Sequence, residues 1–517
     1  MDTTLPHRKT LSRCNRLLWA ALALAGISAA VLYLLGQICD PDFFWHLKTG
    51  EWIWQHKALP ATDPFSINPP TIPTPHQKFV LNSYWLSQLV MYGCYTSAGW
   101  GGIIALRFLL AGLAIVILAR RCNLRDAGVM GLLILVAINF FEEYTLDRPQ
   151  VISFVCFTLL ISMVDRFSEC RSGQPHPALF APALSLLMLV WANLHGGYFV
   201  GQLVLILVVI MEGIRFSHPA LRPLSHTGYK RLVIAVSAAL VCSLINPNFI
   251  SSLQEMFFTI SSNSFAASIN KEYFSLLHKW RESGSPTLFI SCFIAFLVIC
   301  SAGSSYRKLD VTMLSIVICT GFYGYQHVRY VPFFLTAAVI FIAQRLGSGV
   351  YGFFSRAIII LAAFGSLYFF TADEVWNRHN VYRQSWISHT RFPVAAADFM
   401  AERHMQGGVF SSYDWGGYLI WRLAPDAKLF IDSRNMDYRR YFQLNYCDDM
   451  RLNNNEHDRY WQKLFNDYDI RYAIVERIDS HGQPHALATF MQWNVDWAMI
   501  FAKDNTAVFV RQGTPRQ

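Results

Sequence analysis

The residues best suited to chemistry lie in the segment DPDFFWHLKTGEWIWQHKALPATDPFS, residues 40–66. Asp40 and Asp42 flank a proline, and His46 follows Asp42 by one helical turn, so Asp42 and His46 can share a face of a helix. Carboxylates at the start of a helix are favoured by its positive N-terminal end, and they could act as a general base or hold a divalent cation. The alternative is that Asp40 or Asp42 only caps the helix.

A second group of charges lies in EEYTLDRP, residues 142–149. Glu142, Glu143 and Asp147 fall in a very short segment between apolar runs, and Arg148 follows directly. Three acids and an arginine are more than a short loop needs for solubility, so they could form part of a site. A structural ion pair that involves Asp147 is the alternative.

Two further segments place basic side chains between apolar runs. WANLHGGYFVG, residues 191–201, holds His195, and QHVRYVPF, residues 326–333, holds His327 and Arg329. An arginine at membrane depth is costly unless it is paired or solvated, and its guanidinium suits a pair of phosphate oxygens. His195 suggests a polar cavity for phosphate or a metal. The alternatives are close helix packing at the glycines beside His195 and snorkelling of Arg329 to lipid headgroups.

The composition indicates that membrane-spanning helices position these residues. The chain has 517 residues, of which 53% are hydrophobic and only 15% charged, whereas a soluble domain carries about 25% charged residues. The formal charge of +9 lies mostly in short loops between apolar runs, which favours membrane topology over nucleic-acid binding as its cause. The 11 cysteines form no CxxC pair and no zinc-type cluster, so we expect structural thiols.

The first membrane span is predicted at residues 17–38, which carry no charge and follow a basic N-terminus that we place in the cytoplasm. Further spans are predicted at 103–119, 127–141, 150–164, 178–192, 198–214, 231–246, 286–302, 311–325, 331–346 and 356–371. This gives about eleven spans, so the C-terminal tail lies outside, and the candidate residues above share the external face. Lys and Arg are enriched in the loops assigned to the cytoplasm, as the positive-inside rule requires. The short apolar stretch 84–99 is expected to lie along the interface.

The tail after residue 371 is richer in charge and predicts a small α/β domain. Short strands are expected at 409–410, 418–421, 429–431, 472–475 and 507–510, and helices at 392–403 and 459–468. The fold class is therefore an α-helical polytopic membrane protein with a small C-terminal α/β domain outside the membrane. We expect a membrane domain at 1–371, which includes a long first external loop at 39–102, and an α/β domain at 372–517.

This layout resembles the GT-C class of glycosyltransferases, which are polytopic enzymes that use a sugar carried on a polyprenyl phosphate. The DPD pair after the first span resembles the acidic motif that opens the first external loop of that class. Residues 83–113 resemble the segment of the lipid-linked mannosyl- and aminoarabinosyltransferases that lies on the membrane and leads into the second span. Arg107 occupies the arginine position of that segment. The external C-terminal domain is the third shared feature.

The chain also resembles a set of uncharacterised bacterial membrane proteins that share a DPDxxWH element. Their ARPQ-like element reads DRPQ here, at residues 147–150. Their tail element reads YDWGGYLIWRLAPDAKLFIDSR, at residues 413–434. This similarity covers nearly the whole chain.

The GT-C resemblance implies an inverting transfer of a sugar from a polyprenyl-phosphate donor to a lipid, protein or glycan acceptor of the cell envelope. The reaction would take place on the extracytoplasmic face of a bacterial inner membrane. Asp42 would be the general base, Asp40 would orient it or share a divalent cation with it, and His46 would complete the catalytic group. Arg329, with Arg148, His195 and His327, would stabilise the departing lipid phosphate. These are the catalytic and lipid-phosphate-binding residues that we expect.

The tail would contribute the acceptor site, which could be lined by Tyr413, Trp415, Asp432 and Arg434. Asp432 and Arg434 are as well explained by an internal ion pair that holds a strand to a turn. Two other functions remain open. One is transport of a lipid-linked glycan across the membrane, which would use intramembrane ionisable residues equally well, although no paired inverted halves are evident. The other is a non-catalytic assembly protein whose tail docks partners in the envelope.

Overall fold

The computed structural model separates the chain into two compact units, each of which is described by itself. The first unit, called the helical unit, comprises Met1–Gly36 and Ile104–Arg383. The second, called the α/β unit, comprises Gln37–Ile103 and Gln384–Gln517. The described residues are 13–122, 126–143, 147–170, 178–218, 221, 224–251, 254, 271–284, 286–304, 309–346, 353–371, 385–434, 436–437, 439–440, 443, 454–479 and 482–513.

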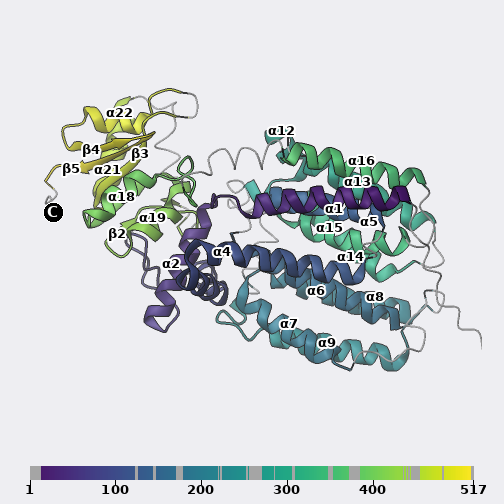
Figure 1. Cartoon of the computed structure of the whole chain (residues 1–517). Helices are drawn as coiled ribbons and strands as arrows, with labels where there is room; N and C mark the ends of the chain where they lie inside the picture. The colour runs from purple at the N-terminus through teal and green to yellow at the C-terminus, as the bar shows by residue number, and fades with distance from the viewer. Residues whose placement is uncertain are drawn as a thin grey trace, which may run out of the picture. The chain divides into compact units, whose positions relative to one another are not determined.

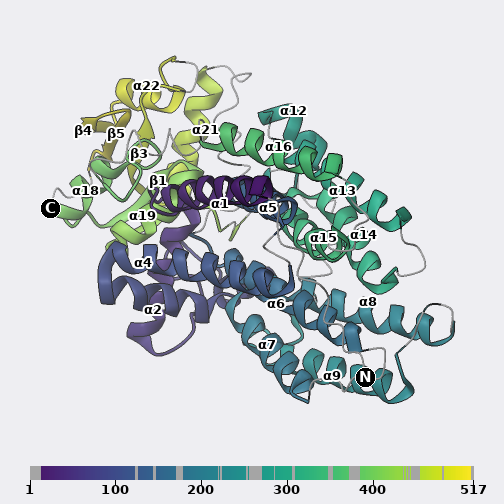
Figure 2. The same cartoon turned by 45° about the vertical axis from the view of Figure 1, so that its right-hand side comes forward.

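The helical unit is built from long apolar helices, and each of the predicted spans overlaps one of them. They are α1 (Arg13–Leu34), the second half of α4 (Trp85–Arg121), α5 (Ala127–Glu143), α6 (Gln150–Glu169), α7 (Phe180–Leu194), α8 (Tyr198–Phe216), α9 (His226–Ser243), α13 (Thr287–Ser304), α14 (Val311–Gln326), α15 (Val331–Leu346) and α16 (Phe353–Phe370). Figures 1 and 2 show these helices running alongside one another. Shorter elements between them are η3 (Lys271–Tyr273), α12 (Leu276–Ser283) and η5 (Val328–Tyr330).

The apolar helices make this a membrane-embedded protein. In the described part of the chain, 4 helical stretches are long and apolar enough to cross a bilayer, and shorter apolar helices accompany them. Helix α15 is the centre of the bundle, because all side chains from Leu335 to Ile342 are fully buried. A helix that is apolar on every face must be surrounded by protein or lipid, and α15 packs on α5, α6, α13 and α14.

Helix α4 bends sharply where the sequence separates the stretch 84–99 from the span at 103–119. Ala98 and Gly99 leave the helical conformation, and Gly99 has φ +57°, which favours glycine. Just beyond the bend, a Cβ on Gly102 would lie 2.0 Å from the carbonyl oxygen of Cys94. The chain therefore doubles back here, and a single continuous span from 85 to 121 is excluded.

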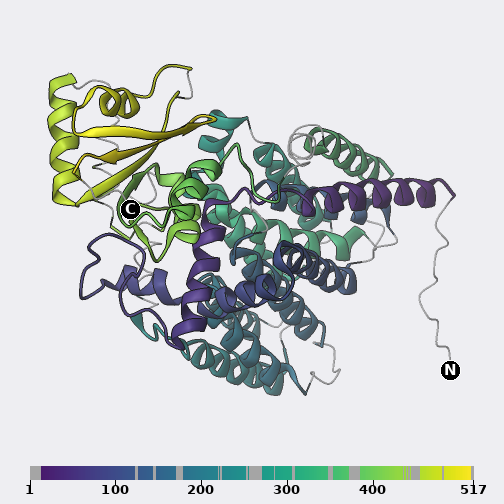
Figure 3. The ribbon, with the colours of Figure 1, turned by 60° about the vertical axis from the view of Figure 1, so that its left-hand side comes forward.

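The α/β unit contains a five-stranded mixed sheet with the order β2-β1-β3-β5-β4. The strands are β1 (Gly407–Ser411), β2 (Ala427–Leu429), β3 (Ile470–Glu476), β4 (Trp497–Lys503) and β5 (Thr506–Arg511). β1 is parallel to β2 and β3, whereas β5 is antiparallel to β3 and β4. Figure 3 shows the strands side by side. The helices of the tail are α18 (Val394–Glu402), α19 (Gly416–Leu423), α21 (Asn454–Asp467) and α22 (Ala486–Trp493), with the short η7 (Tyr413–Trp415) before α19.

The predicted strand at 418–421 is wrong, because these residues belong to helix α19. Its residues from Gly416 to Ile420 are all buried. Burial on every side removes the alternation that distinguishes a strand from a helix, and the aromatic and β-branched residues then favoured the strand.

The segment 37–103 is an integral part of the α/β unit. It contains α2 (Pro41–His56), α3 (Pro75–Asn82) and the first half of α4. Residues Phe65 and Ile67 exchange backbone hydrogen bonds of 2.9 Å with Leu429 and so extend the sheet beyond β2. The sequence assigned this loop to the membrane domain, whereas the contacts group it with the tail. Two stretches far apart in sequence thus build one unit.

Candidate functional site

Asp40 is the N-cap of helix α2. Its carboxylate accepts the backbone N–H of Asp42 at 2.8 Å, Pro41 occupies the first helical turn, and the side chain of Asp40 is 1% exposed. This geometry satisfies one of the N–H groups that a helix start leaves without a partner. Of the two interpretations of Asp40, helix capping or a direct role in chemistry, the structure shows helix capping.

Asp42 is half-buried and is held by donors from two parts of the chain. Its Oδ1 accepts the indole N–H of Trp45 at 3.1 Å and the hydroxyl of Ser433. Ser433 lies in the tail between Asp432 and Arg434, which the sequence had singled out, but Ser433 itself had not been predicted. A carboxylate that is fixed in this way and still partly exposed can be reached by a bound hydroxyl group.

His46 is buried between α2 and α4. Its Nδ1 accepts the side-chain N–H of Gln88 at 3.1 Å, and its ring packs on Trp45 and Tyr84. Trp45 thus contacts both Asp42 and His46, which the sequence placed on one helix face. Because Nδ1 is an acceptor in this arrangement, the neutral ring carries its proton on Nε2.

Arg434 forms the centre of a buried charged group. Its guanidinium donates to both oxygens of Asp63, at 2.8 and 3.0 Å, and to both oxygens of Asp432, at 2.7 and 2.8 Å. Burial alone would raise the pKa of the Asp63 carboxyl, but the charge and hydrogen bonds of Arg434 lower it below its ordinary value. The internal ion pair proposed for Asp432 and Arg434 is present, and Asp63, which had not been singled out, extends it.

The other two predicted acceptor residues surround the same segment. The hydroxyl of Tyr413 donates to the carbonyl of Ser433 at 3.2 Å. Trp415 is buried just before α19 begins. The four residues therefore gather around positions 432–434, although the charge of Arg434 is already paired with both Asp432 and Asp63.

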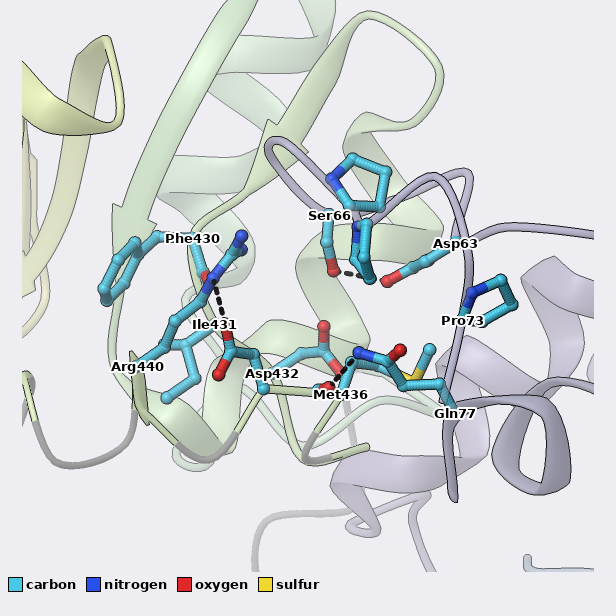
Figure 4. A pocket seen from close by; sticks show the side chains of 12 residues that line it. Asp63, Ser66, Pro73, Gln77, Phe430, Ile431, Asp432, Met436 and Arg440 are labelled. Atoms are coloured by element: carbon cyan, nitrogen blue, oxygen red, sulfur yellow. Dashed lines mark hydrogen bonds and ion pairs between the residues drawn. The ribbon is translucent and has the colours of Figure 1, made fainter. Parts of the chain in front are cut away.

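A small hollow lies between the segment 63–77 and the segment 430–440 (Figure 4). Asp63 and Ser66 face it from one segment, and Asp432 and Arg440 face it from the other. Its volume is about 30 Å³, which is room for a water molecule rather than a sugar. Arg440 holds the two segments together, since it donates to the carbonyl of Phe430 at 2.8 Å and to that of Ile67.

In the helical unit, His195 lies in the turn between α7 and α8. Its Nδ1 accepts the backbone N–H of Gly197 at 2.9 Å and contacts the hydroxyl of Ser153 at 2.7 Å, while Trp191 donates to the same hydroxyl. Burial, and then the positive charge of Arg329, lower the pKa of His195 to about 3. His195 is therefore a neutral N–H donor at physiological pH.

Arg329, His327 and Arg148 meet around the short element η3. The guanidinium of Arg329 lies 4.7 Å from the ring centre of Tyr273, and Nδ1 of His327 is 2.8 Å from the carbonyl oxygen of Tyr273. Arg148 forms an ion pair with Glu272, the neighbour of Tyr273. All four predicted phosphate-binding residues belong to the helical unit, and the positive charge of Arg329 acts on His195.

Asp147 is a partner of Arg107 in a buried ion pair. Arg107 Nε donates to Asp147 at 2.7 Å, and its Nη1 donates to the carbonyls of Leu34 and Gly36 at 3.0 and 2.7 Å. The structural alternative therefore describes Asp147, and its partner is Arg107. The side chains of Glu142 and Glu143 lie outside the described residues.

An apolar cavity of about 350 Å³ lies among α1, α4, α5, α6 and α16 of the helical unit. It is lined almost entirely by aliphatic and aromatic side chains, from Trp19 and Leu22 at one end to Phe141 and Phe370 at the other. Its chemistry suits a hydrocarbon chain. Among the side chains that the structure describes, no three His, Cys, Asp or Glu residues gather as metal ligands.

Comparison with known proteins gives matches among solved structures. No family model and no curated protein sequence matches the chain. The archaeal oligosaccharyltransferase AglB from Archaeoglobus fulgidus, in complex with an inhibitory peptide and a dolichol-phosphate, is similar with a TM-score of 0.55 and 11% identity, over 88% of this chain and 69% of that one. ArnT from Cupriavidus metallidurans bound to undecaprenyl phosphate is similar with a TM-score of 0.52 and 11% identity, over 96% of this chain and 98% of that one. These likenesses show a GT-C fold.

Proposed function

We propose that this chain is an inverting membrane glycosyltransferase that moves a sugar from a polyprenyl-phosphate donor to an acceptor of the cell envelope. We place the reaction on the extracytoplasmic face of a bacterial inner membrane. The observation that carries the proposal is Asp42, a partly exposed carboxylate at the start of α2 whose orientation is fixed by Trp45 and Ser433. The GT-C fold supports it, and the lipid phosphates bound to the two similar proteins suggest the class of donor.

In this proposal, Asp42 is the general base. The acceptor hydroxyl attacks the anomeric carbon on the side opposite the phosphate and transfers its proton to Asp42, so the configuration at that carbon inverts. Asp40 supports the reaction by fixing the start of α2 rather than by contacting the sugar. We propose that His46, through its packing on Trp45, keeps the indole directed at Asp42.

The leaving group is the lipid phosphate, and its negative charge needs stabilisation. We assign this role to the cluster of Arg329, Arg148, His195 and His327. Arg329 would supply the charge, since guanidinium groups bind phosphate oxygens in pairs. His195 would contribute an N–H donor rather than a charge, because its pKa of about 3 keeps it neutral. The apolar cavity of the helical unit offers a place for the isoprenoid chain.

A divalent cation is not needed for this scheme. Asp40 uses an oxygen to cap α2, and one oxygen of Asp42 already receives two donors, so these two acids alone are a weak ligand set.

The test is a comparison of cells that express the wild type or Asp42→Asn at matched membrane levels in place of their own copy. We expect Asp42→Asn to lower transfer by at least about 10²-fold, because the amide cannot accept the proton. Mass spectrometry should show loss of one surface glycan and accumulation of its lipid-linked sugar. Glu51→Gln is the matched control and should leave the glycan unchanged, because Glu51 lies on the same helix and pairs with nearby Lys48 and Gln55.

An unchanged glycan in the Asp42→Asn cells would contradict the proposed base. If those cells also bound the lipid-linked sugar normally, transport of that lipid would become the better explanation. If those cells bound none of the lipid-linked sugar, a non-catalytic assembly role would become the better explanation.

A further inference from the structure

We infer that Ser433, in the C-terminal tail, is a positioning residue for Asp42, and that the buried Asp63–Arg434–Asp432 group holds Ser433 in place for this role. The inference rests on the proposed function of Asp42 as a base. It assigns the tail a part in the chemical step itself.

Ser433 contacts Asp42 directly. The hydroxyl of Ser433 and the indole N–H of Trp45 donate to the same oxygen, Oδ1. Two donors from different directions fix both the position and the rotation of a carboxylate. The direction of the second oxygen, Oδ2, is fixed by the same two bonds. A base that is already oriented loses less entropy when the acceptor arrives.

Ser433 is itself held in place by the residues on both sides of it. Asp432 and Arg434, its chain neighbours, are buried and bonded to each other, and the backbone N–H of Arg434 also donates to Asp432 at 2.9 Å. Asp63 binds the other edge of the Arg434 guanidinium, and Tyr413 donates to the carbonyl of Ser433. The backbone of Ser433 therefore has little freedom to move away from Asp42.

Helix α19 lies close to both the start of α2 and the segment that holds Ser433. A Cβ on Gly417 would lie 2.0 Å from the carbonyl oxygen of Pro41, and a Cβ on Gly416 would lie 2.5 Å from Cα of Asp432. The two glycines thus let the start of α19 touch the DPD turn on one side and the 432–434 segment on the other. Any larger residue would separate the hydroxyl of Ser433 from Asp42. The tail motif YDWGG…IDSR and the DPD motif are consequently parts of one arrangement.

The chemistry predicts which kinetic constant changes. Ser433 bonds Asp42 rather than the sugar, so its loss should lower kcat and leave KM nearly unchanged. Misplacement of a catalytic group by about 1 Å costs up to about 10²-fold in rate. We therefore expect Ser433→Ala to lower kcat about 10- to 100-fold with KM within about twofold of wild type. Ser433→Thr keeps the hydroxyl and should recover most of the rate.

The experiment uses the purified full chain, with the lipid-linked sugar that accumulates in Asp42→Asn cells as donor and membranes of those cells as acceptor. Four variants are compared with wild type: Ser433→Ala, Ser433→Thr, Asp42→Asn, and the double variant Asp42→Asn/Ser433→Ala. Ser97→Ala is the control, because Ser97 is exposed and its hydroxyl donates to the carbonyl of Gly93 in its own helix. Thermal unfolding of each variant shows whether it is folded.

The expected result is a kcat loss in Ser433→Ala, recovery in Ser433→Thr, and no further loss in the double variant relative to Asp42→Asn. Wild-type kcat in Ser433→Ala, or a raised KM with wild-type kcat, would overturn the inference while the proposed function stands. If Ser433→Ala does not fold, an inactive but folded Ser433→Thr overturns it as well. Full transfer by Asp42→Asn would instead overturn the proposed function, and this inference with it.

Discussion

At the scale of single residues, Arg434 shows how a buried charge can serve geometry. A guanidinium with two carboxylate partners is electrostatically satisfied, yet replacing such a group by apolar residues is often neutral for stability. Here the planar guanidinium fixes the orientation of both carboxylates, because Asp63 and Asp432 bind two of its edges at 2.8 and 2.7 Å. Removing one partner is a different matter, since it leaves a buried charge partly uncompensated.

We expect Asp63→Asn to destabilise the protein by about 3 kcal/mol at neutral pH, because Arg434 loses one of its two carboxylate partners in a buried site. The measurement is the thermal unfolding of the purified protein in detergent. Asp469→Asn is the comparison, since Asp469 and its partner Arg471 are both exposed and the change should cost far less. Equal losses in the two variants would contradict the special role of the buried group.

The same pair predicts a dependence of stability on pH. The folded-state pKa of Asp63 lies below its unfolded value, so its stabilising contribution is complete above that value, which is about 4, and is lost as the pH falls through the folded pKa. The stability gap between wild type and Asp63→Asn should therefore be constant from about pH 7 to 5 and should narrow below about pH 4. A gap that widens in acid would show the opposite sign and contradict the assignment.

At the scale of elements, the packing of α19 on α2 depends on a missing side chain. The Cβ of an alanine at position 417 would overlap the carbonyl of Pro41, so the two helices would have to separate. The same principle acts at Gly50, where a Cβ would lie 2.2 Å from the carbonyl of Gln88. Helix α2 is thus held closely on two sides by backbone contacts.

Gly417→Ala should lower stability by about 1–3 kcal/mol and lower transfer by more than Ser433→Thr does, because it displaces the whole start of α2. Unfolding temperature and donor turnover measure the two effects. The matched control is Gly93→Ala in α4, where a Cβ meets nothing within 4 Å and alanine should be neutral or slightly stabilising. Normal activity in Gly417→Ala would indicate that α2 tolerates the shift.

Many of these helices could be predicted from the sequence, because the apolar runs that indicate them are long. Each predicted span overlaps a helix of the helical unit, since fifteen or more apolar residues between charged loops leave few alternatives. The tail was predicted as α/β for similar reasons, with the exception of 418–421. Ser433, Asp63 and the Arg107–Asp147 pair could not be fully predicted. Their partners lie between 40 and 391 positions away, and single-sequence patterns report only near neighbours.

At the scale of the whole molecule, the orientation across the membrane can be tested directly. We place the N-terminus in the cytoplasm and the α/β unit outside, as the distribution of Lys and Arg indicates. In intact cells, a membrane-impermeant maleimide should therefore label Val495→Cys, at a position that is 84% exposed, above the wild-type background. Lys9→Cys should be labelled only after the cells are opened. The reverse pattern would invert the predicted topology.

The composition of the α/β unit from Gln37–Ile103 and Gln384–Gln517 also sets an order of events during synthesis. Helix α2 is made early. Gly416, Gly417 and Ser433, which complete its surroundings, are made only after the whole of Ile104–Arg383. At about 5–20 residues per second, this delay is roughly 15–60 s. During that time, the face of α2 that packs on α19 in the complete chain lacks this partner. A chain that terminates early would carry the acid pair without its surroundings, so the arrangement at Asp42 is completed only in a chain that has been translated nearly to its end.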